Sequence, residues 1–381
     1  MKARILALLV PFIASIVLGA GSESSSDDIV SPAQAARVQQ VQHIYLSDVD
    51  SKAGTAILNY DHLVGGSSRA ASVSINLVTG ELSAIRRKPD SSAEDDDSTS
   101  PSGRFFLEFA EGPPANILIK DKKGGKALKL SERDIPDFMD VEWCPRKDVL
   151  SMKGDIKGTD NESGLYLYFV EDRKLRLIVR GLTGHSWWSS DGRYLICLRQ
   201  SPAAKKMARR TYDLLGTIVV LDADRGFKTV LSAGELADTV FLSPSNTRLA
   251  FIDRVKDEYG DLDNRALRVA DLRTGRVNNV AVNRRKISYM WVGDDALAVT
   301  TYDKHAVPTL NLIPATGGSS TRLVTTPEFA FIQPAAYLPN RKLAVYVATT
   351  LTSDDKPYEL WAVQSGRKPV RLFPKNVRAQ R

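Results

Sequence analysis

Trp188-Ser189-Ser190-Asp191-Gly192-Arg193-Tyr194-Leu195 is the stretch of this 381-residue chain that decides its fold. An aromatic residue precedes a short polar turn, and the turn leads into an apolar strand. Related units carry proline in the turn, as in Ser243-Pro244, where proline presets φ, while glycine supplies a positive φ. The stretch therefore predicts two antiparallel strands joined by a tight turn.

Two series of turns run the length of the chain. Units like the one above, with an apolar residue, a turn and an apolar strand, begin at steps of 44 to 54 residues, at Thr99, Trp143, Trp188, Leu242, Trp291 and Tyr337. Between them lie turns that mostly contain glycine, at Thr79-Gly80, Gly124-Gly125, Asp172-Arg173-Lys174, Gly226, Thr274-Gly275, Gly317-Gly318 and Ser365-Gly366. Interleaved turns at this spacing predict four strands in each repeat.

Seven such repeats predict an all-β fold, a seven-bladed β-propeller of four-stranded antiparallel blades, with six or eight blades as alternatives. Radial repetition buries the faces of every sheet and leaves only short edges. The predicted blades span 43–88, 97–131, 138–180, 184–232, 238–282, 286–325 and 329–374. In the second, the acidic run within 91–98 is expected to be a solvated loop rather than a strand or a calcium site.

The composition is that of a globular protein. Hydrophobic residues make up 43% and charged residues 25%, which excludes a disordered, collagen-like or multi-span membrane chain. The net charge of +7 falls to +5 without the first 20 residues, too little to predict a nucleic-acid surface. Cys144 and Cys197 are too few for a disulfide scaffold or a four-cysteine zinc site, and whether they pair is left open.

The N-terminus has the pattern of a secretory signal peptide. Lys2 and Arg4 precede an uncharged apolar run from Ile5 to Leu18, and small residues follow. A membrane anchor is the alternative, but a spanning helix needs about 20 apolar residues. We therefore expect a signal peptide at 1–20, a flexible leader at 21–42, the propeller at 43–375 and a basic tail at 376–381. The mature chain is expected to have no membrane span and to be periplasmic or secreted.

The turn units at Ser189-Ser190-Asp191-Gly192 and Ser243-Pro244-Ser245-Asn246 resemble the repeat of TolB-type, WD40-like (PD40) β-propellers. The resemblance covers about 43–375. It implies the fold, and it implies a role typical of that group, which consists of periplasmic or extracellular binding modules and the propeller halves of some peptidases. TolB-type proteins pair a small α/β domain with six blades, so the resemblance is to the propeller alone.

The two ends of the predicted sheets differ. With the strands of each sheet lettered A to D, the short A–B and C–D turns share one end. The B–C and D–A connections share the other end and are expected to be long and dissimilar, as in 201–216. Variable loops on a rigid scaffold commonly bind ligands, so we expect the long-loop end to be the working end. The alternative is that these loops are tolerated insertions.

Candidate binding residues lie at or near that end. His185 and Trp187 fall in a predicted inner strand, where they could face a ligand. A basic cluster could meet phosphate or carboxylate groups, or could be only a solvated loop; it consists of Lys205, Lys206, Arg209 and Arg210. In contrast, Trp143, Trp188 and Trp291 occupy one repeat position and are expected to pack between sheets.

These observations predict a monomeric, non-catalytic protein that binds a protein, peptide or anionic envelope polymer, without nucleic acid, metal or cofactor. No Gly-x-Ser-x-Gly elbow, P-loop, dinucleotide fingerprint or His-Glu-x-x-His motif is present. The alternative is a metal-assisted polysaccharide lyase or hydrolase resembling the seven-bladed oligogalacturonate lyases, which are of similar length and use a histidine-rich metal site. The four histidines, His43, His62, His185 and His305, show no spacing that establishes such a site.

Overall fold

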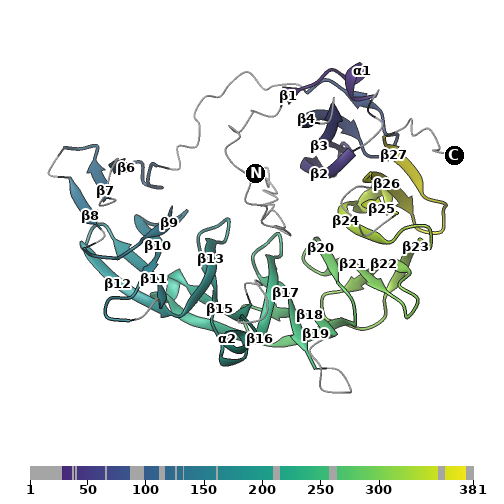
Figure 1. Cartoon of the computed structure of the whole chain (residues 1–381). Helices are drawn as coiled ribbons and strands as arrows, with labels where there is room; N and C mark the ends of the chain where they lie inside the picture. The colour runs from purple at the N-terminus through teal and green to yellow at the C-terminus, as the bar shows by residue number, and fades with distance from the viewer. Residues whose placement is uncertain are drawn as a thin grey trace. The chain divides into compact units, whose positions relative to one another are not determined.

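The computed structural model describes residues 28–36, 38, 41–64, 67–85, 98–110, 116–124, 127–131, 133–159, 162–208, 215–256, 264–350 and 357–374. The predicted signal peptide and basic tail lie outside these ranges, as do Arg209, Arg210 and most of the acidic run within 91–98. The chain divides into two compact units, one made of 1–88 with 283–381 and the other of 89–282. Most of their strands are labelled in Figure 1, and each unit is described by itself.

The first unit begins with a sheet whose strands follow one another in sequence. Its strands are β2 (Val41–Asp50), β3 (Thr55–Val64), β4 (Ser67–Asn76) and β5 (Leu82–Ser83). Two short elements of the predicted leader join it: β1 (Asp28–Ile29) pairs in parallel with β4, and α1 (Pro32–Ala35) follows. Ser31 and Gln34 form a capping box at α1, and Ala35 is buried. This part of the leader is thus ordered by a helix cap and by pairing along β4.

Two further four-stranded sheets complete the first unit. One contains β20 (Ser288–Val292), β21 (Ala296–Tyr302), β22 (Pro308–Pro314) and β23 (Thr321–Thr325). The other contains β24 (Phe331–Leu338), β25 (Leu343–Thr349), β26 (Glu359–Gln364) and β27 (Val370–Phe373). In both, each strand pairs antiparallel with the next along the chain.

The N-terminal and C-terminal sheets of this unit share one apolar core. Leu58 and Val73 lie in the same buried cluster as Val345 and Leu360. Tyr60 contacts Phe373 with ring centroids 5.0 Å apart, and the backbone N–H of Tyr358 donates to the carbonyl of Val41 at 2.8 Å. Segments about 300 residues apart are therefore held together by side-chain packing and this backbone hydrogen bond rather than by exchange of a strand.

The second unit contains a three-stranded, a four-stranded and a seven-stranded sheet. The first has β6 (Phe105–Ala110), β7 (Asn116–Asp121) and β8 (Leu128–Ser131), with Thr99 bridged to Phe106 beside β6. The second has β9 (Met139–Trp143), β10 (Val149–Asp155), β11 (Ser163–Phe169) and β12 (Lys174–Arg180). The third runs through β13 (Leu182–Trp188), β14 (Tyr194–Arg199), β15 (Gly216–Asp222), β16 (Lys228–Leu242), β17 (Arg248–Val255), β18 (Asn264–Asp271) and β19 (Val277–Asn283).

The seven-stranded sheet corrects one expectation from the sequence. A long D–A connection was predicted between 232 and 238, but β16 runs straight through and serves two neighbouring sets of strands. Gly234, at φ +72°, and a register shift after Asp238 bend the strand instead of ending it. The D–A connection before β13 is also short, a single Gly181 at φ +68°. At these two places, long loops are absent from the predicted loop-rich end.

The predicted class of fold is confirmed: the chain is all-β, built from sequential antiparallel sheets with recurring turns, the repeat of a β-propeller. All seven glycine-type turns lie between paired strands, as predicted. Two of the three tryptophans at the repeat position join neighbouring sheets: Trp143 donates to the carbonyl of Ser98 at 3.0 Å, and Trp188 donates to Ser151 Oγ at 2.9 Å. Among the described residues, no helix has the length and apolarity needed to cross a membrane.

Candidate functional site

His185 lies in an irregular part of β13. Thr183 pairs with Leu198 and Ser186 with Cys197, so two residues of β13, Gly184 and His185, have no counterpart in the ladder. Gly184, at φ +70°, allows the chain to bulge there. The side chain of His185 lies outside the regular ladder and is 71% exposed.

The exposed imidazole is held by a carboxylate from the neighbouring sheet. Nδ1 of His185 lies 2.8 Å from Oδ2 of Asp140, a residue of β9 with only 23% of its side chain exposed. An imidazole that donates Nδ1–H to a carboxylate presents Nε2 as a hydrogen-bond acceptor. The pair thus offers a fixed polar group at a surface that is open to a partner.

Asp140 was not singled out in the sequence, although a signal was present. Asp140 lies three residues before Trp143, and His185 lies three residues before Trp188. The two residues therefore occupy the same position in neighbouring repeats. Aligning the repeats on their tryptophans would have placed an acid beside the histidine in adjacent inner strands.

Trp187, the second candidate on β13, serves mainly as a core residue. It pairs with Ile196 and packs, half-buried, against a cluster containing Tyr194, Ile218 and Phe251. Burial of an aromatic ring in such a cluster stabilises the sheet whether or not a ligand is bound.

The basic cluster lies partly on a helix. Lys205 and Lys206 are exposed on α2 (Pro202–Ala208), whose Ala204 packs with Leu215 and Leu236. Ser201 fixes the helix start by accepting from the Ala204 N–H and donating to the Glu235 carbonyl. Within the described ranges, neither lysine forms an ion pair, and no hydrogen bond joins them to His185. Both α2 and the start of β13 nevertheless lie at the B–C end of this sheet, as predicted.

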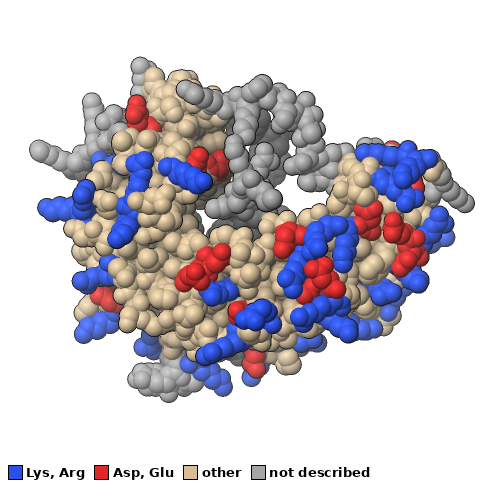
Figure 2. Space-filling model, turned by 180° about the vertical axis from the view of Figure 1, so that it is seen from behind, with Lys and Arg blue, Asp and Glu red and all other residues tan. Residues whose placement is uncertain are grey.

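The other three histidines, His43, His62 and His305, belong to the first unit. His43 stacks on Tyr358 at a centroid distance of 5.8 Å, His62 lies beside Tyr60, and His305 follows the turn residue Asp303. Over the part of the chain that the structure describes, no group of three or more His, Cys, Asp or Glu side chains could hold a metal ion. Charges of both signs are interleaved on the face shown in Figure 2, without a single broad basic patch.

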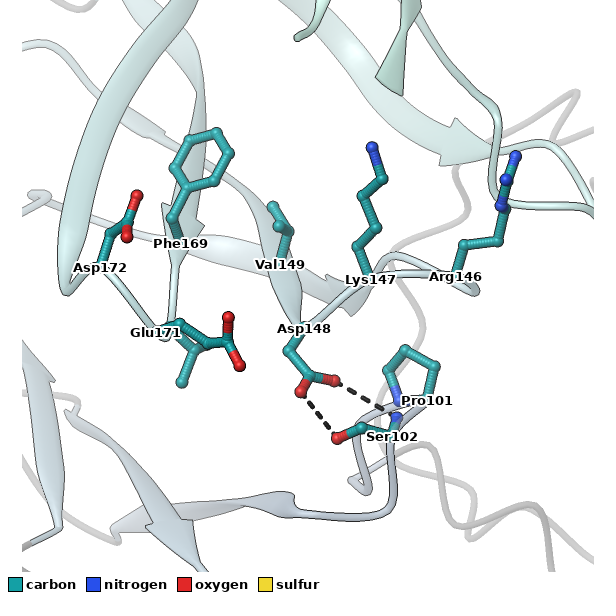
Figure 3. A pocket seen from close by; sticks show the side chains of 10 residues that line it. Pro101, Ser102, Arg146, Lys147, Asp148, Val149, Phe169, Glu171 and Asp172 are labelled. Carbon is teal, nitrogen blue, oxygen red and sulfur yellow. Dashed lines mark hydrogen bonds between the residues drawn. The ribbon is translucent and has the colours of Figure 1, made fainter. Parts of the chain in front are cut away.

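A pocket of about 440 Å³ lies at the opposite, short-turn end of the second unit. We call it the turn-end groove; residues 101–102, 146–149 and 169–172 line it. They come from the turn before β6 and from the β9–β10 and β11–β12 turns of the β9–β12 sheet, as Figure 3 shows. The sequence does not reveal this pocket, because each turn is ordinary alone and the hollow exists only where two sheets meet.

Hydrogen bonds between turns fix the shape of this groove. Asp148 accepts from the Ser102 hydroxyl at 2.6 Å and from the Ser102 N–H at 3.3 Å (Figure 3). The Phe169 ring packs edge-on against Phe227 at 5.7 Å, and the Arg176 guanidinium lies 4.9 Å from its centre. The Phe169 ring therefore packs toward the sheet that carries Phe227, and charged side chains form the rim of the groove.

No protein-family model and no curated protein matches this chain. The chain is similar to the β-propeller domain of the Trilobed protease from Pyrococcus furiosus, at 13% identity and a TM-score of 0.42, covering 88% of this chain and 99% of that one. It is also similar to TolB from Acinetobacter baumannii (14%, 0.30, 73% and 64%) and to an oligogalacturonate lyase in complex with manganese (13%, 0.38, 70% and 72%). It spans about half the length, 53%, of an acylaminoacyl peptidase from Pyrococcus horikoshii. At these identities, neither activities nor ligands transfer to this chain.

Proposed function

We propose that this chain is an exported, non-catalytic β-propeller that binds a protein, peptide or anionic envelope polymer at the end of the second unit that carries His185 and α2. The observation that carries the proposal is the His185–Asp140 pair. An imidazole so exposed, yet fixed by a carboxylate on the next sheet, is arranged to meet a partner rather than to support the core. Export rests on the predicted signal peptide.

The polar side chains at this end of the second unit limit which partners can bind there. Nε2 of His185 accepts a hydrogen bond from a hydroxyl or amide, and the ammonium groups of Lys205 and Lys206 attract carboxylate or phosphate groups. A polymer or peptide with both donors and anionic groups therefore fits best. The attraction to the lysines is expected to weaken as salt is raised.

The test is capture of partners from the native cell envelope by the immobilised chain. His185→Ala and the double variant Lys205→Glu with Lys206→Glu are expected to lose the captured partner, because they remove the acceptor and reverse the charge. The matched control is Lys174→Glu with Lys228→Glu, two exposed lysines at the starts of β12 and β16, which should retain it. Unchanged thermal unfolding would show that each variant folds.

Two results would contradict the proposal. Loss of capture by the control pair alone would place the working surface elsewhere. Stoichiometric metal in the purified protein, lost on His185→Ala, would support the metal-assisted lyase instead.

A further inference from the structure

The last strand of the seven-stranded sheet has an open edge. β19 pairs with β18 on one side and, among the strands that the structure describes, with none on the other (Figure 1). The edge of a strand presents a row of backbone N–H and C=O groups that can pair with a further strand. Whether another strand is admitted depends on the side chains that the edge strand carries.

β19 differs from the other outer strands in its charge. The outer strands β8, β12, β23 and β27 each contain lysine or arginine, and β12, which like β19 is seven residues long, contains three. Such charges are a common means of keeping other strands off an edge. β5, the outer strand of the first sheet, is uncharged but only two residues long. β19 is therefore the one long strand of this group that lacks a charged residue.

The side chains of β19 favour strand pairing. Val277 is 37% exposed and Val282 is 56% exposed, and the strand contains neither proline nor glycine. Valine is enriched in strands because its branched side chain packs well against neighbours on a pleated surface. A strand added to this edge would cover both valines in addition to forming backbone hydrogen bonds.

The residues that flank β19 disfavour a second copy of the chain as the added strand. Arg276 directly precedes the strand, Arg284 directly follows it, and both are exposed. In an antiparallel pair of β19 strands centred on Val280, Arg276 of each copy would lie opposite Arg284 of the other. In a parallel pair in register, Arg276 would lie opposite Arg276. Like charges opposite each other destabilise a strand pair, whereas a carboxylate opposite Arg276 stabilises it.

We propose that β19 binds an extended segment of a partner protein as an additional strand. The segment has uncharged, β-branched residues along β19 and an aspartate or glutamate opposite Arg276. Backbone hydrogen bonds supply the affinity, while the exposed valines and the arginine select the sequence. This edge is distinct from the His185 end, so the inference goes beyond the function proposed above and does not depend on it.

The test is binding of a fluorescein-labelled nonapeptide, with two aspartates at each end of Thr-Val-Thr-Val-Thr, to the full chain, followed by fluorescence anisotropy. Asn279→Asp with Val282→Asp places two carboxylates on β19 and is expected to weaken binding about fivefold, because like charges then face each other across the strands. The matched control, Thr321→Asp with Thr325→Asp, adds the same charge at two exposed positions of β23 and should bind as the unaltered chain does.

A second probe separates strand addition from attraction by charge, and it uses the unaltered chain, so it does not depend on the folding of a variant. The same nonapeptide with every second backbone amide methylated keeps its four carboxylates but loses the donors that a strand needs. It is expected to show no binding.

Four outcomes would overturn the proposal. The unaltered chain could fail to bind the unmethylated peptide. The methylated peptide could bind equally well, which would show that charge alone attracts it. The β23 control could lose as much affinity as the β19 variant, which would place the effect outside this edge. The unaltered chain could form a dimer that Asn279→Asp with Val282→Asp abolishes, which would make a second copy the occupant.

Discussion

Trp188 shows what one repeat position does at the scale of a residue. Its indole N–H donates to the hydroxyl of Ser151, both groups are buried, and the two residues belong to neighbouring sheets. A buried N–H without a partner costs more free energy than the net gain of making the bond. The hydrogen bond therefore fixes which way the ring lies between the sheets.

Ser151→Ala is expected to lower the free energy of unfolding by about 1–3 kcal/mol, because it leaves the Trp188 N–H unsatisfied. In the Trp188→Phe background no indole N–H is present, so Ser151→Ala no longer leaves a buried donor unsatisfied. The effects of the two changes on the free energy of unfolding should therefore be less than additive, with a coupling of at least about 0.5 kcal/mol. Urea unfolding of the two single variants and the double variant measures this. The control cycle pairs Ser151→Ala with Trp187→Phe on the same strand. Additivity in the Trp188 cycle, or equal coupling in both, would contradict the inter-sheet bond.

The two cysteines give a second prediction at the residue scale. Both lie in one buried apolar cluster, and burial raises the pKa of the Cys144 thiol and raises that of Cys197 to about 12. The thiolate is the reactive form, so neither residue should react with a thiol reagent at pH 8 in the folded protein. In denaturant without reductant, both should react. Rapid reaction of the folded chain would contradict the burial, and no reaction after unfolding would show that the cysteines are paired.

At the scale of elements, the strands that lead into several of the glycine-type turns, β4, β7, β15 and β18, end on the same kind of residue. Oδ1 of Asn76, Asp121, Asp222 or Asp271 accepts a backbone N–H of the turn that follows. In such Asx turns the Asn or Asp side chain holds the backbone of the turn. Glycine in the next positions therefore favours the turn but is not required to form it. In two sheets, an arginine directly before the neighbouring strand also pairs with this aspartate: Arg104, before β6, with Asp121, and Arg193, before β14, with Asp222.

Asp271 allows this turn to be tested by pH. Burial alone would raise its pKa, but hydrogen bonds from Thr274 and Arg273 outweigh burial and lower it. A lowered native pKa means that the charged form stabilises the fold above about pH 4 and that this contribution is lost as pH falls further. Asp271→Asn keeps the acceptor, as Asn76 does, and should lose less stability between pH 5 and pH 3 than the unaltered chain. Asp271→Ala should cost about 1 kcal/mol at pH 6.

Urea unfolding at several pH values measures both effects. Parallel loss of stability in the unaltered chain and in Asp271→Asn would show that another group carries the acid dependence. Asp121, whose pKa is lowered chiefly by its hydrogen bond from Arg104, would then be the next residue to test.

The turns were predictable because their chemistry is local. Gly192 and Asp191 shape the chain between neighbouring strands, whatever surrounds them. The continuity of β16 was not predictable from the sequence, because whether a strand ends or bends near Gly234 depends on the sheets on both sides. Contacts between sheets were also not predictable from the sequence. The hydrogen-bond partner of His185 and the shape of the turn-end groove depend on how neighbouring sheets are aligned, and the sequence of a single repeat does not define that alignment.

At the scale of the molecule, the first unit joins its N-terminal and C-terminal sheets mainly through side-chain packing. Phe373 is buried against Tyr60 in the cluster that the first and last sheets share. Phe373→Ala is expected to lower the free energy of unfolding by about 3–5 kcal/mol and leave a cavity beside Tyr60. Because the cavity opens onto both sheets, amide exchange should rise in β3 as well as in β27. Leu323→Ala, in the separate cluster around Phe329, is the control and should leave β3 protected. Faster exchange confined to β24–β27 would mean that the N-terminal sheet is stable without its C-terminal neighbour.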